Sequence, residues 1–88
     1  MAQTAKDSAA LIDQYIEPNP DQPGSGDARL RDYGVPVWAL IGYIQATGRD
    51  AAATARAYRL PTEAVESALA YRDCHPAEIA ARIAENAA

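Results

Sequence analysis

Apolar residues recur at helical spacing in the middle of the chain. Over 37–47 they fall three and four positions apart, as one face of an amphipathic helix requires. Those residues are Val37, Leu40, Ile41 and Ile44, with Trp38 beside them. Pro36 suits the start of a helix and Gly48 suits the position just past its end. The pattern therefore predicts a helix over 37–47.

Two shorter helices joined by a tight turn are predicted next, over 51–58 and 61–73. Ala55 lies mid-way along the first helix, where a small side chain lets a second helix approach closely. Leu60 fills the turn from inside, and Val65 is expected to pack back onto Ala55. This spacing is typical of a helix-turn-helix, either a nucleic-acid reading head or a compact docking module.

The ends of the helices carry capping signals. Asp50 is a natural N-cap for 51–58, and Ser8 is expected to cap one or two helical turns over 8–15. Pro76 either kinks the preceding helix or starts a fourth one over 77–85. The apolar stripe of that fourth helix would be Ile79, Ala80 and Ile83.

A loop and an extended arm occupy the stretch before 37. Residues 17–27 hold three prolines and two glycines, which excludes a helix there. Residues 28–37 alternate Leu30 with charged neighbours and are interpreted as a short strand, which must pair with residues 15–17 or with another chain. Pairing across a two-fold axis predicts a homodimer, and an intrachain hairpin in a monomer is the alternative. The predicted dimerisation residues are Tyr15, Ile16, Leu30, Tyr33 and Val35.

These elements predict a mainly α fold: a helix-turn-helix bundle of three or four helices with a short N-terminal β-element. The expected segments are an acidic N-terminal segment and loop (1–27), the arm with the helix-turn-helix (28–75), and a C-terminal amphipathic tail (76–88). With 88 residues the chain is expected to form one domain. Hydrophobic residues make up 49% of the chain, but many are alanine and none is Phe, so the core is expected to be thin.

The cysteine content bears on the cellular location of the protein, and the distribution of charge bears on its binding partners. Cys74 is the single cysteine, and no signal peptide or membrane-spanning run is evident, so we expect a reducing, cytoplasmic location without a membrane. The net charge of −4 is unevenly placed. Residues 29–59 carry five basic residues against two acidic ones, whereas both flanking segments are acidic. The basic middle suits phosphate contact, and the acidic ends suit a basic protein partner.

Two motifs give the chain a resemblance to a known family. The first is the G-x-P-V sequence at the start of a helix, here Gly34-Val35-Pro36-Val37. The second is the pattern A-x-x-Y-x-L-x-x-x-x-V-x-x-A-L-x-Y, which runs from Ala55 to Tyr71. With both motifs in order over about residues 11–85, the chain resembles the small bacterial and archaeal family catalogued as domain of unknown function four-thirty-three.

The resemblance implies a helix-turn-helix protein preceded by a short β-element. Many such proteins look like VapB-like antitoxins, paired with a PIN-like, presumed ribonuclease toxin that they bind and silence. Such antitoxins often repress their own operon as well. The chain departs from the family in its acidic, proline-rich loop before Gly34 and in Pro76, where relatives have a continuous helix.

The expected functional residues fall into two groups. DNA binding is expected from the reading helix and from arginines that could hold phosphates. This group is Arg56, Arg59, Thr62, Glu63, Ser67, Arg29 and Arg31. Toxin binding is expected from the tail, where apolar anchors lie beside charges and Arg82 could intrude on the nuclease carboxylates. This group is Glu78, Ile79, Arg82 and Ile83, although the two isoleucines could instead complete the chain's own core.

No catalytic site, metal site or cofactor is expected. Cys74 and His75 are adjacent in sequence, which does not direct both groups at one substrate atom, and two ligands are too few for zinc. Two other functions remain open: a stand-alone DNA-binding transcriptional regulator, and a dimerising adaptor that binds no DNA.

Overall fold

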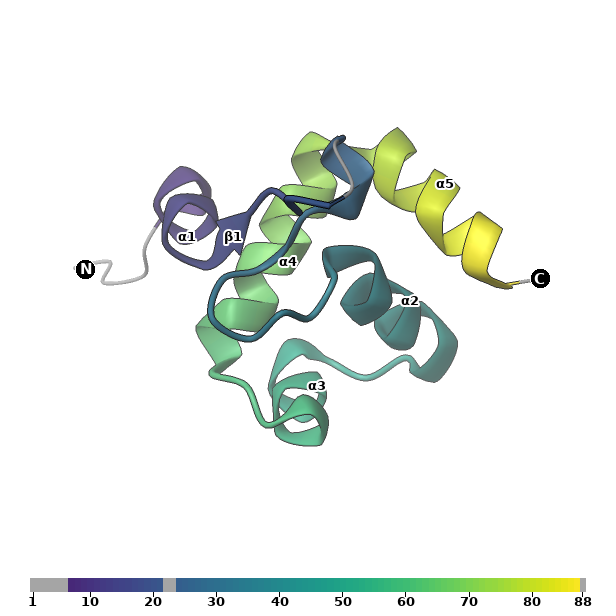
Figure 1. Cartoon of the computed structure of the whole chain (residues 1–88). Helices are drawn as coiled ribbons and strands as arrows, with labels where there is room; N and C mark the ends of the chain where they lie inside the picture. Colours follow the sequence, from purple (N-terminus) through teal and green to yellow (C-terminus); the bar gives the residue numbers. More distant parts are fainter. Residues whose placement is uncertain (1–6, 22–23, 88) are drawn as a thin grey trace.

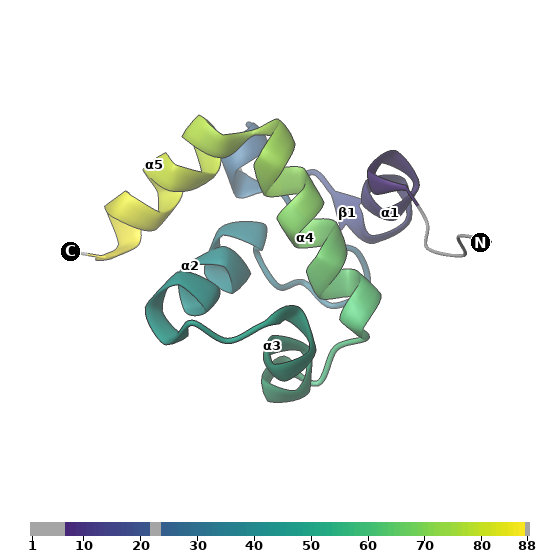
Figure 2. The same ribbon diagram turned by 180° about the vertical axis from the view of Figure 1, so that it is seen from behind.

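The structure, a computed structural model, describes residues 7–21 and 24–87. It is mainly helical, with a short two-stranded sheet near the N-terminus, as predicted (Figure 1). Its elements are α1 (Ser8–Tyr15), β1 (Ile16–Glu17), the 3₁₀ turn η1 (Ser25–Asp27), β2 (Arg29–Leu30), α2 (Val37–Thr47), α3 (Ala51–Tyr58), α4 (Thr62–Cys74) and α5 (Pro76–Ala87). Helix α4 runs through the middle, with α1 on one side and α2 and α3 on the other (Figures 1 and 2).

Side-chain caps fix the starts of two helices. The Asp50 carboxylate accepts a hydrogen bond of 2.8 Å from the Ala53 N–H, so Asp50 is the N-cap of α3, as predicted. The same bond at α1 is made by Asp7, whose carboxylate accepts from Ala10 at 2.8 Å. The prediction that Ser8 caps α1 is therefore wrong by one residue, since Ser8 is already helical.

The turn between α3 and α4 has the geometry of a helix C-cap. Arg59 adopts a left-handed conformation (φ 58°), and the Leu60 N–H donates to the Ala55 carbonyl at 2.8 Å. Ala55 and Val65 are both buried, at 2% and 0% exposure. Because α3 and α4 pack against each other across this turn, the helix-turn-helix arrangement is present.

The two strands pair with each other inside the chain. Strands β1 and β2 are antiparallel, with Ile16 opposite Leu30 and Glu17 opposite Arg29. The structure therefore has the intrachain pairing of the two alternatives, and the homodimer stays a prediction. The strand also ends earlier than expected, because the chain turns after Leu30 and Gly34 (φ 72°) donates its N–H back to the Leu30 carbonyl.

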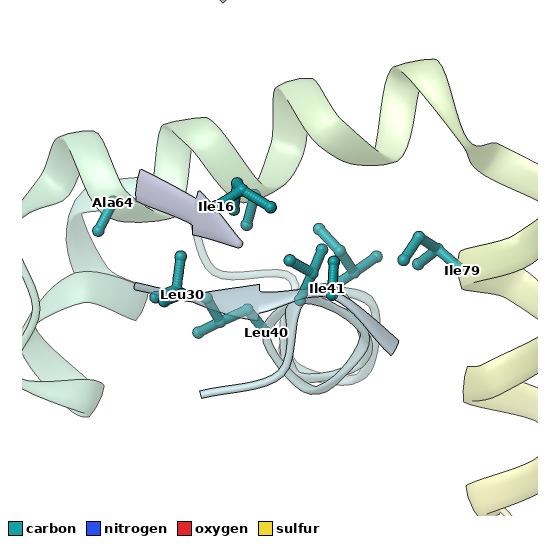
Figure 3. Close-up of a cluster of buried hydrophobic side chains, with 9 residues drawn as sticks. Ile16, Leu30, Leu40, Ile41, Ala64 and Ile79 are labelled. Atoms are coloured by element: carbon teal, nitrogen blue, oxygen red, sulfur yellow. The ribbon is translucent and has the colours of Figure 1, made fainter. Parts of the chain in front are cut away.

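The core joins the sheet to α2, α4 and α5. Leu30 and Leu40 are fully buried, and Ile41 is 1% exposed. Helix α4 presents Ala64 and Ala68 to this cluster, so the sheet and α2 can lie close to its backbone (Figure 3). Small residues on the central helix therefore set how tightly the bundle packs.

Helix α5 is a separate element held by distant parts of the chain. It starts at Pro76, directly after the α4 C-cap, which confirms the fourth-helix alternative for this proline. Helix α5 contacts both α2 and η1, and Ile79 is 1% exposed in the core. At η1 a side chain on Gly26 would come within 2.9 Å of the Glu78 carbonyl oxygen. Glycine is therefore required for this close approach.

Within the described residues, no helix is both long enough and apolar enough to cross a membrane.

Candidate macromolecule-binding surfaces

Four arginines are neutralised by carboxylates of the same chain. Arg29 donates to Glu17 at 2.8 Å, across the strand pair. Arg31 lies 3.9 Å from Glu17 and also donates to the Ile16 carbonyl at 2.9 Å. The other two pairs are Arg72 with Asp73 at 2.9 Å, and Arg82 with Asp27 at 2.7 Å and with Glu85. Two of the arginines predicted to contact DNA, Arg29 and Arg31, therefore bind residues of β1 instead.

The other three arginines are exposed, and their guanidinium groups make no ion pair or hydrogen bond within the described residues. Arg49 precedes α3, Arg56 lies in its last turn, and Arg59 is its C-cap. Helix α3 lies at one edge of the molecule, away from α1 and from the start of α5 (Figures 1 and 2). Within residues 7–21 and 24–87, the unpaired arginines therefore lie on α3 and immediately beside its two ends. Sequence reasoning placed Arg56 and Arg59 in the DNA-binding group, but Arg49 only among additional phosphate contacts.

The first turns of α4 present fewer groups than predicted. Thr62 is exposed, but Ser67 is fully buried and donates its hydroxyl to the Ala64 carbonyl at 2.6 Å. Glu63 is half-buried and accepts a hydrogen bond of 3.2 Å from the Tyr15 hydroxyl. The expectation that Ser67 contacts DNA is therefore wrong. Glu66, like Thr62, is exposed in the first turns of α4.

The predicted dimerisation residues do not form a common surface. Ile16 and Leu30 are buried in the chain's own core, at 7% and 0% exposure. Tyr15 and Val35 are half-buried and pack against the same core. Tyr33 alone of the five is well exposed, at 44%. The assignment of Ile16 and Leu30 to a dimer interface is therefore wrong, because the strands already use them internally.

The predicted toxin-binding residues on α5 also include both residues used within the chain and residues that stay exposed. Ile79 is a core residue, so its assignment as an anchor for a partner is wrong. Arg82 is tied to Asp27 and Glu85 and is not free to act as a counter-ion elsewhere. Glu78 is exposed, whereas Ile83 is half-buried and packs partly against the core, so only part of its side chain remains accessible.

Ile83 lies at the edge of an apolar groove where α2, α3 and α5 meet. The groove has a volume of about 370 Å³. It is lined by Trp38, Ala39, Gly42, Tyr43, Tyr58, Ile83 and Asn86. Tyr43 and Tyr58 meet edge to face, with ring centroids 5.3 Å apart. Sequence reasoning did not identify this groove, because its aromatic rings come from two helices and its rim from a third. The available signal was the placement of Trp38 and Tyr43 off the buried face of α2.

The neighbourhood of Cys74 offers a wide apolar cleft but no metal site. Cys74 is exposed, and His75 stacks on Tyr71 with ring centroids 4.5 Å apart. The cleft between α1 and the end of α4 has a volume of about 570 Å³ and includes Asp13. No group of three or more potential metal ligands is found in the part of the chain that the structure describes.

Burial of Tyr15, together with the hydrogen bond its hydroxyl donates to Glu63, raises the pKa of this phenol above its ordinary value of 10.0. The folded state therefore favours the protonated form more than the unfolded state does. Its stabilising contribution is complete below pH 10 and is lost as the pH rises through the raised pKa. We expect Tyr15→Phe to flatten the loss of stability in this alkaline range, as measured by urea unfolding at a series of pH values.

The matched control is Tyr33→Phe, at an exposed position. Its unfolding is expected to follow the unmodified chain across the same range. Equal alkaline slopes for Tyr15→Phe and the unmodified chain would show that Tyr15 is not responsible.

Comparison of the chain with protein-family models, with curated proteins and with solved structures found no match.

Proposed function

We propose that the chain is the antitoxin of a type II toxin–antitoxin pair, which binds and neutralises a PIN-like ribonuclease toxin. Two features support the proposal: the resemblance of two motifs to the family catalogued as domain of unknown function four-thirty-three, and a surface suited to a protein partner. The groove where α2, α3 and α5 meet is the observation that carries the proposal.

The motif residues hold structural positions. Gly34 takes a positive φ of 72° before α2, and Pro36 is the N-cap of that helix. In the second motif Ala55, Val65 and Ala68 are buried where α3, α4 and α2 pack. The motifs therefore support a shared fold, and the argument for a protein partner rests on what the fold leaves exposed.

The groove offers a partner three aromatic rings and one aliphatic side chain. Aromatic residues are enriched where protein interfaces derive most of their binding energy. Trp38, Tyr43 and Tyr58 are each only partly buried within the chain, so a partner can still remove water from them. Ile83 completes the rim on α5.

The charge on α5 suits a nuclease. This helix lines the groove through Ile83, exposes Glu78 in its first turn, and carries two acidic residues, Glu78 and Glu85, against one basic residue, Arg82. A ribonuclease toxin needs a basic surface around its metal site in order to hold RNA. An acidic helix beside an apolar groove complements such a surface, which favours rapid and selective association.

Co-expression with a PIN-like ribonuclease tests the proposal, and any such protein encoded beside this chain is the one to use. The chain is expected to restore growth and to co-purify with the nuclease. Ile83→Glu places a charge in the groove and is expected to weaken neutralisation by at least about tenfold, or roughly 1.4 kcal/mol of binding free energy. Ala84→Glu adds the same charge one residue later, at an exposed position, and is the matched control.

Persistent toxicity with the chain in excess would overturn the proposal. Equal loss of neutralisation in Ile83→Glu and Ala84→Glu would remove the groove as the binding surface. Circular dichroism of both variants establishes that each is folded before its binding is compared.

A stand-alone DNA-binding regulator is the second candidate function, and the unpaired arginines around α3 favour it. This candidate predicts no complex with a PIN-like ribonuclease, and binding to its own promoter in preference to unrelated DNA. The small number of free polar groups at the start of α4 argues against such preference, because base recognition in a helix-turn-helix relies on those positions.

A further inference from the structure

We infer that α3 and its two ends bind the phosphate backbone of duplex DNA without reading its sequence. The surface consists of Arg49, Arg56 and Arg59 and is called the arginine edge. It shares α3 with the groove, which Tyr58 lines, but it includes none of the groove's lining residues and does not depend on the proposed nuclease partner.

The first step is the distribution of paired and unpaired cations. Each arginine outside the arginine edge has a carboxylate of the chain within 4.0 Å, among the described residues. The three in the edge have none, and all three are exposed. An arginine that is already paired must lose its partner before it can bind a phosphate, whereas an unpaired one exchanges only water and small ions. The edge is therefore the part of an acidic chain that is prepared to bind a polyanion.

The second step is position. An eight-residue helix such as α3 is about 12 Å long. Arg49 lies before its start, and Arg56 and Arg59 lie three residues apart at its end. In a helix-turn-helix the first helix crosses the DNA backbone while the second enters the major groove. Helix α3 is the first helix of this unit, so the cations lie where the backbone contacts of such a unit are made.

The third step is what α4 lacks. Base recognition requires free donors and acceptors in the first turns of the second helix. Here Ser67 is buried and Glu63 is held by Tyr15. Glu66 is exposed, but its carboxylate repels phosphate, and Thr62 alone distinguishes bases poorly. Backbone contacts without base contacts give affinity without sequence preference.

Salt dependence gives a quantitative test. Three phosphate contacts predict a slope of about −2.7 for log K against log salt with duplex DNA. Binding should therefore weaken by about 40-fold between about 50 and about 200 mM salt. The measurement is fluorescence anisotropy of two labelled duplexes of equal length and unrelated sequence. Both are expected to bind equally and with the same slope.

Variants identify the surface. Each single change, Arg49→Gln, Arg56→Gln or Arg59→Gln, is expected to lower the slope by about 1 for both duplexes. The triple variant is expected to show no binding at the lowest salt concentration. Arg72→Gln removes the same charge from α4, at an arginine already paired with Asp73, and is expected to leave binding unchanged.

Four results of the direct measurements would overturn the inference. They are no binding at low salt, an unaffected triple variant, a preference of tenfold or more for one duplex, and equal loss in Arg72→Gln. Two further results, obtained with competitors, would also overturn it. A single strand of equal length that binds more tightly would exclude backbone contact by a duplex-shaped surface, and poly-glutamate that binds as tightly as DNA would show a surface for acidic proteins instead.

Discussion

Leu30→Ala is expected to lower the free energy of unfolding by about 2–5 kcal/mol, the usual cost of a large-to-small change in a core. Leu30 is fully buried and belongs to the cluster that joins the sheet to α2 and α4. Domains of this size are stable by roughly 5–15 kcal/mol, so the loss is a large fraction of the total. Urea unfolding followed by circular dichroism measures it.

Tyr33→Ala is the matched control, because Tyr33 lies three residues later and is 44% exposed. Its expected change is within about 0.5 kcal/mol. Protein concentration provides a second check on Leu30. A core residue gives the same loss at all concentrations, whereas a residue at a dimer interface gives a loss that changes with dilution. A small loss of unfolding free energy, or a loss that depends on protein concentration, would indicate instead that Leu30 lies at a dimer interface.

Ile79→Ala is the second change with a large expected effect, also about 2–5 kcal/mol. Ile79 is 1% exposed and is the α5 residue that belongs to the core cluster. The Arg82–Asp27 ion pair and the close approach of Gly26 lie within the first two turns of α5, and Ile83 packs only partly against the core. We therefore expect the variant to free α5 first, which hydrogen exchange of the α5 amides measures directly.

Ile83→Ala is the comparison on the same helix, since Ile83 is only half-buried at the groove rim. A smaller loss of stability is expected there, with exchange near that of the unmodified chain in the first turn of α5. If the two variants were equally destabilised, Ile79 would not be the principal anchor of α5.

Signals that act within one helical turn were sufficient to predict much of the fold. Asp50 and Gly48 were placed correctly because a cap is decided by its nearest neighbours in sequence. The apolar face of α2 was equally clear, since Leu40 and Ile41 are large and regularly spaced. The misplaced cap at α1 arose because Asp7 and Ser8 are adjacent and both suited to the role.

Features that depend on distant residues could not be predicted. Arg82 pairs with Asp27, 55 residues away, so the sequence alone suggested a free cation on the tail. Ser67 was misplaced because α4 buries small residues: Ala64, Ala68 and Ser67 carry too weak an apolar signal to mark the inward face. The groove was missed because Tyr43 and Tyr58 meet only when α2 and α3 pack.

The contact between η1 and α5 has a consequence for synthesis. Gly26 leaves the ribosome some fifty residues before Glu78, the residue against whose backbone it packs. Helix α1 likewise packs against α4, which is translated later. Early segments whose partners are translated later stay open to proteases until those partners emerge. Nascent chains halted before α5 should therefore be degraded faster than chains halted just after it.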